Sequence, residues 1–121
     1  MKIHAIEVGR VHVCNEHIEG SNNRLWVFKS KSWARTIPIY AYLIEHPNGL
    51  ILFDTGENPR CNEPTYFPWW ALKTVKFEVH QEDAVDKKLH AIGFRAEEIK
   101  YVILSHLHSD HIGGVHFFQE C

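Results

Sequence analysis

A dense group of metal-binding side chains occupies one short stretch of this sequence. His106, His108, Asp110 and His111 fall within six residues, directly after the apolar run of residues 101–104. Neutral imidazole and carboxylate groups are ligands for Zn²⁺, and Fe or Mn would also accept this donor set. The stretch therefore predicts a metal site, and a metal ion that lowers the pKa of a bound water to about 7 supplies a hydrolytic nucleophile.

The spacing divides these four residues into two pairs. In an extended segment that leaves a strand, side chains at positions i and i+2 point to the same side, so His106 and His108 can bind one ion. The chain must then turn, which directs Asp110 and His111 elsewhere at the start of a helix. There they could bind a second ion about 3.5–4 Å away, as in two-metal hydrolytic sites.

Single members of this group also have simpler explanations. An aspartate at the start of a helix is commonly an N-cap, and Asp110 could have that role beside or instead of metal binding. His116 lies five residues after His111 and would be turned away from the ligand side of a helix, so we do not expect it to be a ligand. We prefer the metal interpretation because four such polar groups otherwise have no reason to lie together beside a buried strand.

The elements that must position this stretch predict an α/β layering of helices on a mixed sheet. Residues 2–13 alternate like a half-exposed strand, with a turn or bulge at Gly9. A hairpin follows, whose second strand is apolar and ends at Asp54. The expected ranges are strands 39–45, 50–54 and 100–104 (the last one buried), an amphipathic helix 82–92 that stops at Gly93, a helical turn 96–99, a helix beginning in 112–118, and irregular segments 14–37 and 57–80.

Composition narrows the class of protein. The chain has 121 residues, 45% of them hydrophobic, and a net charge of −2, which fits one globular domain and disfavours nucleic acid or an anionic membrane as a partner. No segment approaches the roughly 20 apolar residues of a membrane span, and the amino terminus has no long apolar region, so we expect a cytoplasmic protein. Three widely spaced cysteines fit reduced thiols better than a disulfide framework.

Taken together, the motifs resemble those of the metallo-β-lactamase superfamily. The resemblance rests on His106-Leu107-His108-Ser109-Asp110-His111, with Gly113-Gly114 behind it and Phe53-Asp54-Thr55-Gly56 upstream. Within the superfamily, the hairpin, the aromatic insertion and the short helix are most similar to those of the quorum-quenching N-acyl homoserine lactonases. The resemblance covers nearly all of the chain but only the N-terminal half of that family's single domain, an αββα sandwich.

The resemblance implies a dinuclear metal hydrolase, with two Zn²⁺ ions in the complete domain. His106 and His108 would be ligands of the first metal, and Asp110 and His111 of the second. Asp54 would be a carboxylate that orients a ligating histidine, although without the resemblance it is as readily a turn aspartate. Metal-bound hydroxide would attack the carbonyl of a lactone or related acyl ester, and Asp110 would also have a catalytic role by passing a proton to the leaving oxygen.

Aromatic residues in the irregular segments are candidates for the wall of a substrate pocket. They could equally close the edge of the sandwich, fill its core or contact a second copy in a homodimer. The residues concerned are Trp26, Phe67, Trp69 and Trp70.

Other functions stay open at this point. A thioester hydrolase of glyoxalase II type and a phosphodiester hydrolase belong to the same superfamily. The family also implies further metal ligands beyond residue 121, so the chain is expected to need a C-terminal half as its partner. The competing hypothesis, of a different class, is a non-catalytic fragment with an exposed sheet edge and an incomplete core.

Overall fold

One mixed sheet and a layer of short helices make up the part of the chain that the computed structural model describes, which is residues 1–15, 33 and 35–118. The strands are β1 (Lys2–Val13), β2 (Ile37–His46), β3 (Gly49–Phe53), β4 (Val75–Glu78) and β5 (Ile99–Ile103). The helices are α2 (Val85–Ala91) and α3 (Ser109–Ile112). Short 3-10 turns cover Pro59–Asn62, Ala71–Lys73, Gln81–Asp83, Ala96–Glu98 and Val115–Phe118.

The strand order is β4-β1-β2-β3-β5, and only the β3–β5 pair is parallel. The predicted hairpin is confirmed, since β2 returns as β3 through a tight turn that Gly49 closes at φ +130°. The predicted irregularity at Gly9 is a bulge, where the β1–β2 register shifts between Glu7 and Arg10. Because β3 and β5 run the same way, their C-terminal ends lie side by side at one edge of the sheet.

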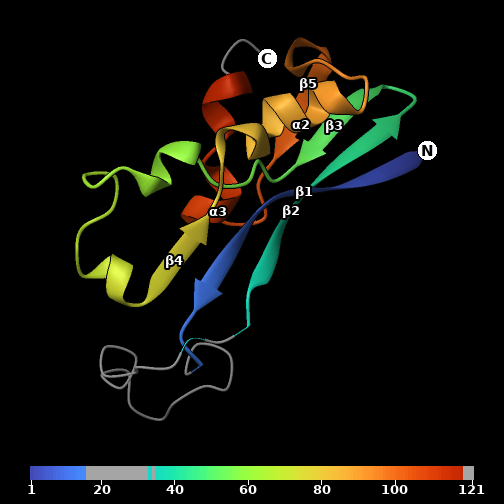
Figure 1. Cartoon of the computed structure of the whole chain (residues 1–121). Helices are drawn as coiled ribbons and strands as arrows, with labels where there is room; N and C mark the ends of the chain where they lie inside the picture. The colour runs from blue at the N-terminus through green and yellow to red at the C-terminus, as the bar shows by residue number, and fades with distance from the viewer. Residues whose placement is uncertain (16–32, 34, 119–121) are drawn as a thin grey trace.

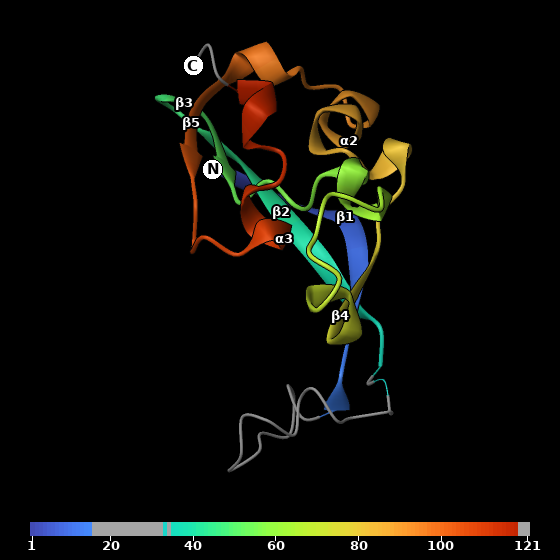
Figure 2. The same ribbon diagram turned by 90° about the vertical axis from the view of Figure 1, so that its left-hand side faces the viewer.

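One face of the sheet carries the core. Figure 1 shows α2, α3 and the 3-10 turns gathered on one side of the long β1–β2 ribbon, and Figure 2 shows the same layering from the side. Leu43 and Leu52 project from the sheet and are fully buried, as is Leu89 of α2. Their burial stabilises the domain by about 2 kcal/mol for each such side chain. None of the described helices is long and apolar enough to cross a membrane.

The opposite face is apolar as well, yet no element among the described residues covers it. Two rows of neighbouring side chains cross four strands there, and Tyr101 and Ile103 on β5 remain 51% and 46% exposed. An apolar face of this size on a soluble protein marks a surface that packs against something else. The rows are Ile3-Ile44-Ile51-Tyr101 and Ala5-Tyr42-Phe53-Ile103.

The structure corrects several predicted elements. β5 is an edge strand with one open face, so the prediction of a buried strand at 100–104 is wrong. β4 was not predicted, because it has only four residues and its pairing with β1 is long-range. The helix at 82–92 starts only at Val85, and Ile92 lies beyond its end and is exposed, although Gly93 does stop it at φ +90°. The last helix begins at Ser109, earlier than the predicted range 112–118.

Candidate metal centre

The loop that follows β5 and the first turn of α3 carry the four predicted metal ligands. His106 and His108 lie in the exposed loop, whereas Asp110 and His111 lie in the helix and are half-buried. Residue His108 occupies the N-cap position of α3 without a side-chain capping bond. The simple alternative for Asp110, that it is the N-cap, therefore does not hold.

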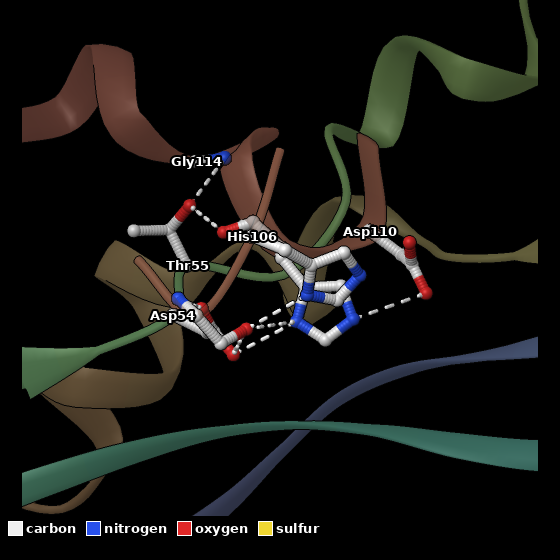
Figure 3. A network of polar contacts seen from close by, with 7 residues as sticks. Asp54, Thr55, His106, Asp110 and Gly114 are labelled. Carbon is white, nitrogen blue, oxygen red and sulfur yellow. Dashed lines mark hydrogen bonds and ion pairs between the residues drawn. The ribbon is translucent and has the colours of Figure 1, made fainter. Parts of the chain in front are cut away.

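The three histidine rings form one cluster. The ring centroid of His106 is 4.6 Å from that of His108 and 4.0 Å from that of His111. Oδ2 of Asp110 lies 3.7 Å from Nε2 of His111. In Figure 3 the carboxylates of Asp54 and Asp110 flank the ring cluster from opposite sides. The fold thus brings all four predicted ligands to one place, together with Asp54 from a strand more than fifty residues earlier.

Asp54 accepts three hydrogen bonds from residues 105–111, the stretch after β5 that we call the ligand loop. Its Oδ1 accepts the backbone N–H of Ser105 at 2.7 Å, and its Oδ2 lies 2.7 Å from the Ser105 hydroxyl and 2.8 Å from Nδ1 of His111. Burial raises the pKa of Asp54, but these hydrogen bonds outweigh it and hold the pKa below its ordinary value. Asp54 has φ +60°, a left-handed conformation that aspartate tolerates and that turns the chain just after β3.

Backbone contacts join the same two loops beside Asp54. The Thr55 hydroxyl donates to the carbonyl oxygen of His111 at 2.9 Å and accepts the N–H of Gly114 at 3.1 Å. Gly113 is packed so closely that a Cβ there would lie 2.3 Å from the backbone nitrogen of Asn58, and its N–H donates to the Gly56 carbonyl at 2.8 Å. The segment 54–58 therefore acts as a rigid support for α3.

The donor set suits a transition metal. Nδ1 of His111 is held by Asp54, which leaves Nε2 for a metal, and this is how ligating histidines are commonly oriented by a carboxylate. Three imidazoles and one carboxylate match the preferences of Zn²⁺. Among the described residues, however, no three His, Cys, Asp or Glu side chains already converge as a complete site. The two pairs of predicted ligands would each need completion by further groups.

An apolar cavity of about 400 Å³ opens beside the ligand loop. Phe67 lies in its wall, and His108, Ser109 and Asp110 form its polar end. Trp69 and Trp70 do not line this cavity and are 70% and 52% exposed, because they lie at a turn of the insertion. Trp26 falls outside the described residues. The other lining residues are Val11, Val13, Ala71, Leu72, Val75 and Phe77.

The roles of three residues in or beside the site were not predicted from the sequence. Ser105 and Thr55 hold Asp54 and α3, and both adjoin residues that were singled out. Glu57 is the third, a carboxylate with 2% exposure. Its place directly after Asp54-Thr55-Gly56 was the available signal, but a charged residue in an irregular segment is ordinarily solvated. His116 is exposed, and its Nδ1 donates to the Gly113 carbonyl oxygen at 3.1 Å.

The chain is similar to a known family of proteins. Residues 34–120 match the family model described as the metallo-beta-lactamase superfamily. An N-acyl homoserine lactonase from Bacillus cereus is 36% identical over 80 residues, which is 64% of this chain and 32% of that protein. The N-acyl homoserine lactonase AiiB of Rhizobium rhizogenes is 30% identical over 120 residues, 97% of this chain and 44% of that protein.

Solved structures show the same fold. An N-acyl homoserine lactone hydrolase, with the product N-hexanoyl-L-homoserine at its catalytic metal centre, superposes with a TM-score of 0.76 and 24% identity over 97% of this chain and 45% of that one. AidC, a dizinc quorum-quenching lactonase, superposes with a TM-score of 0.60 and 26% identity, over 93% of this chain and 35% of that one. The predicted fold class is therefore confirmed, and the chain spans less than half the length of the proteins that it matches.

Proposed function

Because this chain belongs to the metallo-beta-lactamase superfamily, we propose that the whole protein is a metal-dependent hydrolase that opens N-acyl homoserine lactones. The observation that carries the proposal is the apolar cavity whose polar end is formed by His108, Ser109 and Asp110. A lactone with an acyl tail needs both features next to each other, since the tail must leave water while the ring meets the reactive groups. The names of the relatives support the same substrate class.

His106 and His108 would hold one metal ion, and Asp110 and His111 a second one. Such ions, for which this donor set suits Zn²⁺, polarise a carbonyl oxygen and activate water when they are bound. Asp54 keeps the His111 ring in place through the 2.8 Å contact with its Nδ1. Asp110 lines the polar end of the cavity, and its carboxylate would carry the proton that the leaving ring oxygen needs.

The cavity lining favours a lactone over the two other hydrolase activities considered. Among the described residues that line it none is Lys or Arg, so these offer no cationic side chain for a phosphodiester or for the carboxylates of a glutathione thioester. Its side walls are aliphatic and aromatic, which suits an unbranched acyl chain.

We also propose that the rest of the domain packs on the open face of the sheet. The two apolar rows there are the surface that a second sheet would cover in an αββα sandwich. The matched relatives have more than half of their length beyond the share that this chain spans, which is enough for such a layer. A homodimer through the same face is the competing arrangement.

The test is a substrate panel on the zinc-loaded protein. N-Hexanoyl homoserine lactone, S-lactoylglutathione and bis(p-nitrophenyl) phosphate would be compared, with and without prior removal of metal by a chelator. We expect metal-dependent turnover of the lactone that His108→Ala abolishes and that His116→Ala, a matched change five residues beyond the second ligand pair, leaves intact. Preferential turnover of either other substrate would contradict the proposed substrate class.

The same panel on the isolated 121-residue chain decides between enzyme and non-catalytic fragment. Because only two pairs of ligands lie among the described residues, we expect weak zinc binding and no turnover from the chain alone. A monomeric 121-residue chain that turns over lactone would show that the site is complete without further ligands.

A further inference from the structure

Glu57 is a buried carboxyl group with an unusual set of contacts. Its side chain is 2% exposed, and its Oε1 accepts the N–H of Asn58 at 2.8 Å and the hydroxyl of Tyr66 at 3.3 Å. The Ser109 hydroxyl lies close enough to affect the carboxyl group, yet Oε2 has no hydrogen-bond partner among the described residues. A half-satisfied buried carboxyl group lowers stability relative to an apolar side chain of the same size.

Of the two side chains around Glu57, Ser109 lines the apolar cavity, whereas Tyr66 packs against Phe67, which lies in the cavity wall. Tyr66 packs edge-on against Phe67, with ring centroids 4.8 Å apart, and Phe67 stacks on Phe77 at 5.4 Å. Ser109 lines the opposite, polar end of the cavity between His108 and Asp110. Glu57 itself does not line the cavity. It therefore lies behind the cavity, at the point where the aromatic wall meets the ligand loop.

We propose that Glu57 is a positioning residue that sets the distance between the aromatic wall and the ligand loop, and with it the length of acyl chain that the cavity accepts. This inference rests on the proposed lactonase function. When Glu57 is present, Tyr66 is held against the support segment 54–58, and Phe67 stays over the cavity. Without it the Tyr66–Phe67 segment loses its polar attachment to that segment, and a long acyl chain loses a fixed wall.

Stability and selectivity should therefore separate on substitution. Glu57→Leu removes the unpartnered oxygen, so the variant should fold as well as the parent or better, whereas its cavity wall is no longer held. Glu57→Gln retains an oxygen for the Asn58 N–H and the Tyr66 hydroxyl. Glu63→Leu is the matched control, because Glu63 lies in the same irregular stretch, residues 57–80, but is exposed and pairs with Arg60.

The experiment compares kcat and KM of the zinc-loaded protein for N-butanoyl and N-decanoyl homoserine lactone. We expect Glu57→Leu to lower the decanoyl-over-butanoyl ratio of kcat/KM about fivefold, through KM for the decanoyl substrate, with Glu57→Gln and Glu63→Leu within about twofold of the parent. Tyr66→Phe should shift the ratio in the same direction, and the Glu57→Leu/Tyr66→Phe double variant should add little to Glu57→Leu. An unchanged ratio in Glu57→Leu overturns the inference.

A second measurement keeps this inference separate from the proposed function. If the parent protein turns over neither lactone, the proposed function fails, and the cavity is then probed by calorimetric titration of metal-free protein with butanoate and decanoate. A decanoate affinity that falls in Glu57→Leu but not in Glu63→Leu supports the positioning role. Equal affinities for decanoate in the parent and Glu57→Leu refute it.

Discussion

Two buried carboxylates, three residues apart on one loop, have opposite environments. Asp54 begins the segment and accepts three hydrogen bonds, whereas Glu57 near its end has one oxygen without a hydrogen-bond partner in the described part of the chain. The pKa of Asp54 is held below its ordinary value. That of Glu57 is raised, mainly by burial and further by the charge of Asp110, against the hydrogen bonds from Ser109, Asn58 and Tyr66. Both carboxyl groups face hydrogen-bond donors, so the balance between burial and hydrogen bonding decides the direction of each pKa shift.

The neighbours of Glu57 extend this difference. Burial and the Glu57 charge raise the pKa of the Cys61 thiol to about 12 and that of Tyr66 to about 12. The Glu57 end of the segment therefore disfavours negative charge, while the Asp54 end is surrounded by N–H and O–H donors and imidazole. Burial thus raises the pKa values at the Glu57 end of the segment, whereas hydrogen bonds lower the pKa at the Asp54 end.

The largest expected effect tests whether backbone contacts, not the carboxyl group, hold the Glu57 end. Gly113→Ala places a Cβ 2.3 Å from the Asn58 nitrogen and 2.6 Å from the Glu57 carbonyl carbon, so backbone must move. We expect a loss of about 3 kcal/mol in the free energy of unfolding, measured by urea denaturation. Gly93→Ala is the control, because φ is +90° there but no atom lies within 4 Å. It should cost only about 1 kcal/mol, and equal losses would refute the close packing.

The next effect tests the Asp54 end directly. Asp54→Ala removes the acceptor that orients His111, so zinc affinity should fall about 10–100-fold in a chelator competition assay. The zinc affinity of Asp54→Asn, which keeps one acceptor oxygen, should lie between that of the parent and that of Asp54→Ala. Asp83→Ala is the matched control, because Asp83 also has a pKa below its ordinary value but pairs with Lys88 away from the site. Undiminished zinc affinity in Asp54→Ala would remove Asp54 from the metal centre.

A smaller effect concerns pH and the Glu57 end. Because the folded-state pKa of Glu57 is raised above 4.5, its contribution to stability is fully present below that pH and is lost as pH rises through the folded value. The free energy of unfolding of the parent should therefore fall relative to Glu57→Leu as pH increases from 4.5 upward. At pH 8 the variant should be more stable by about 1 kcal/mol. A constant difference across this range would show that Glu57 ionises as readily in the folded protein as in the unfolded one.

The smallest effect comes from Tyr66. Tyr66→Phe deletes a hydroxyl that donates to Glu57 over 3.3 Å, a long hydrogen bond, and should cost about 0.5 kcal/mol in thermal or urea unfolding. In a Glu57→Leu background the same change should cost nothing, since the acceptor is gone. An undiminished cost in that background would mean that the Tyr66 hydroxyl has another partner.

The sequence was most informative where chemistry is local. Four ligand-type residues within one hexapeptide, and the turn residues Pro47 to Gly49, require only neighbouring residues to be interpreted, and the structure brings the four together and forms the hairpin. β4 and the exposure of β5 could not be obtained in this way. Both depend on which strand lies alongside and on what covers a face, and those are contacts between distant parts of the chain.

The two carboxylates show the same division. By itself the sequence determined that an aspartate stands at the end of one strand and that a stretch of metal-ligand residue types follows another strand. Residue types and short spacings are properties of the chain alone. Only the tertiary structure decided that Asp54 faces Ser105 and His111 while Glu57 lies between Tyr66 and Ser109. The parallel pairing of β3 with β5 brings Asp54 to its donors, whose hydrogen bonds outweigh burial, whereas at Glu57 burial outweighs the hydrogen bonds that it accepts.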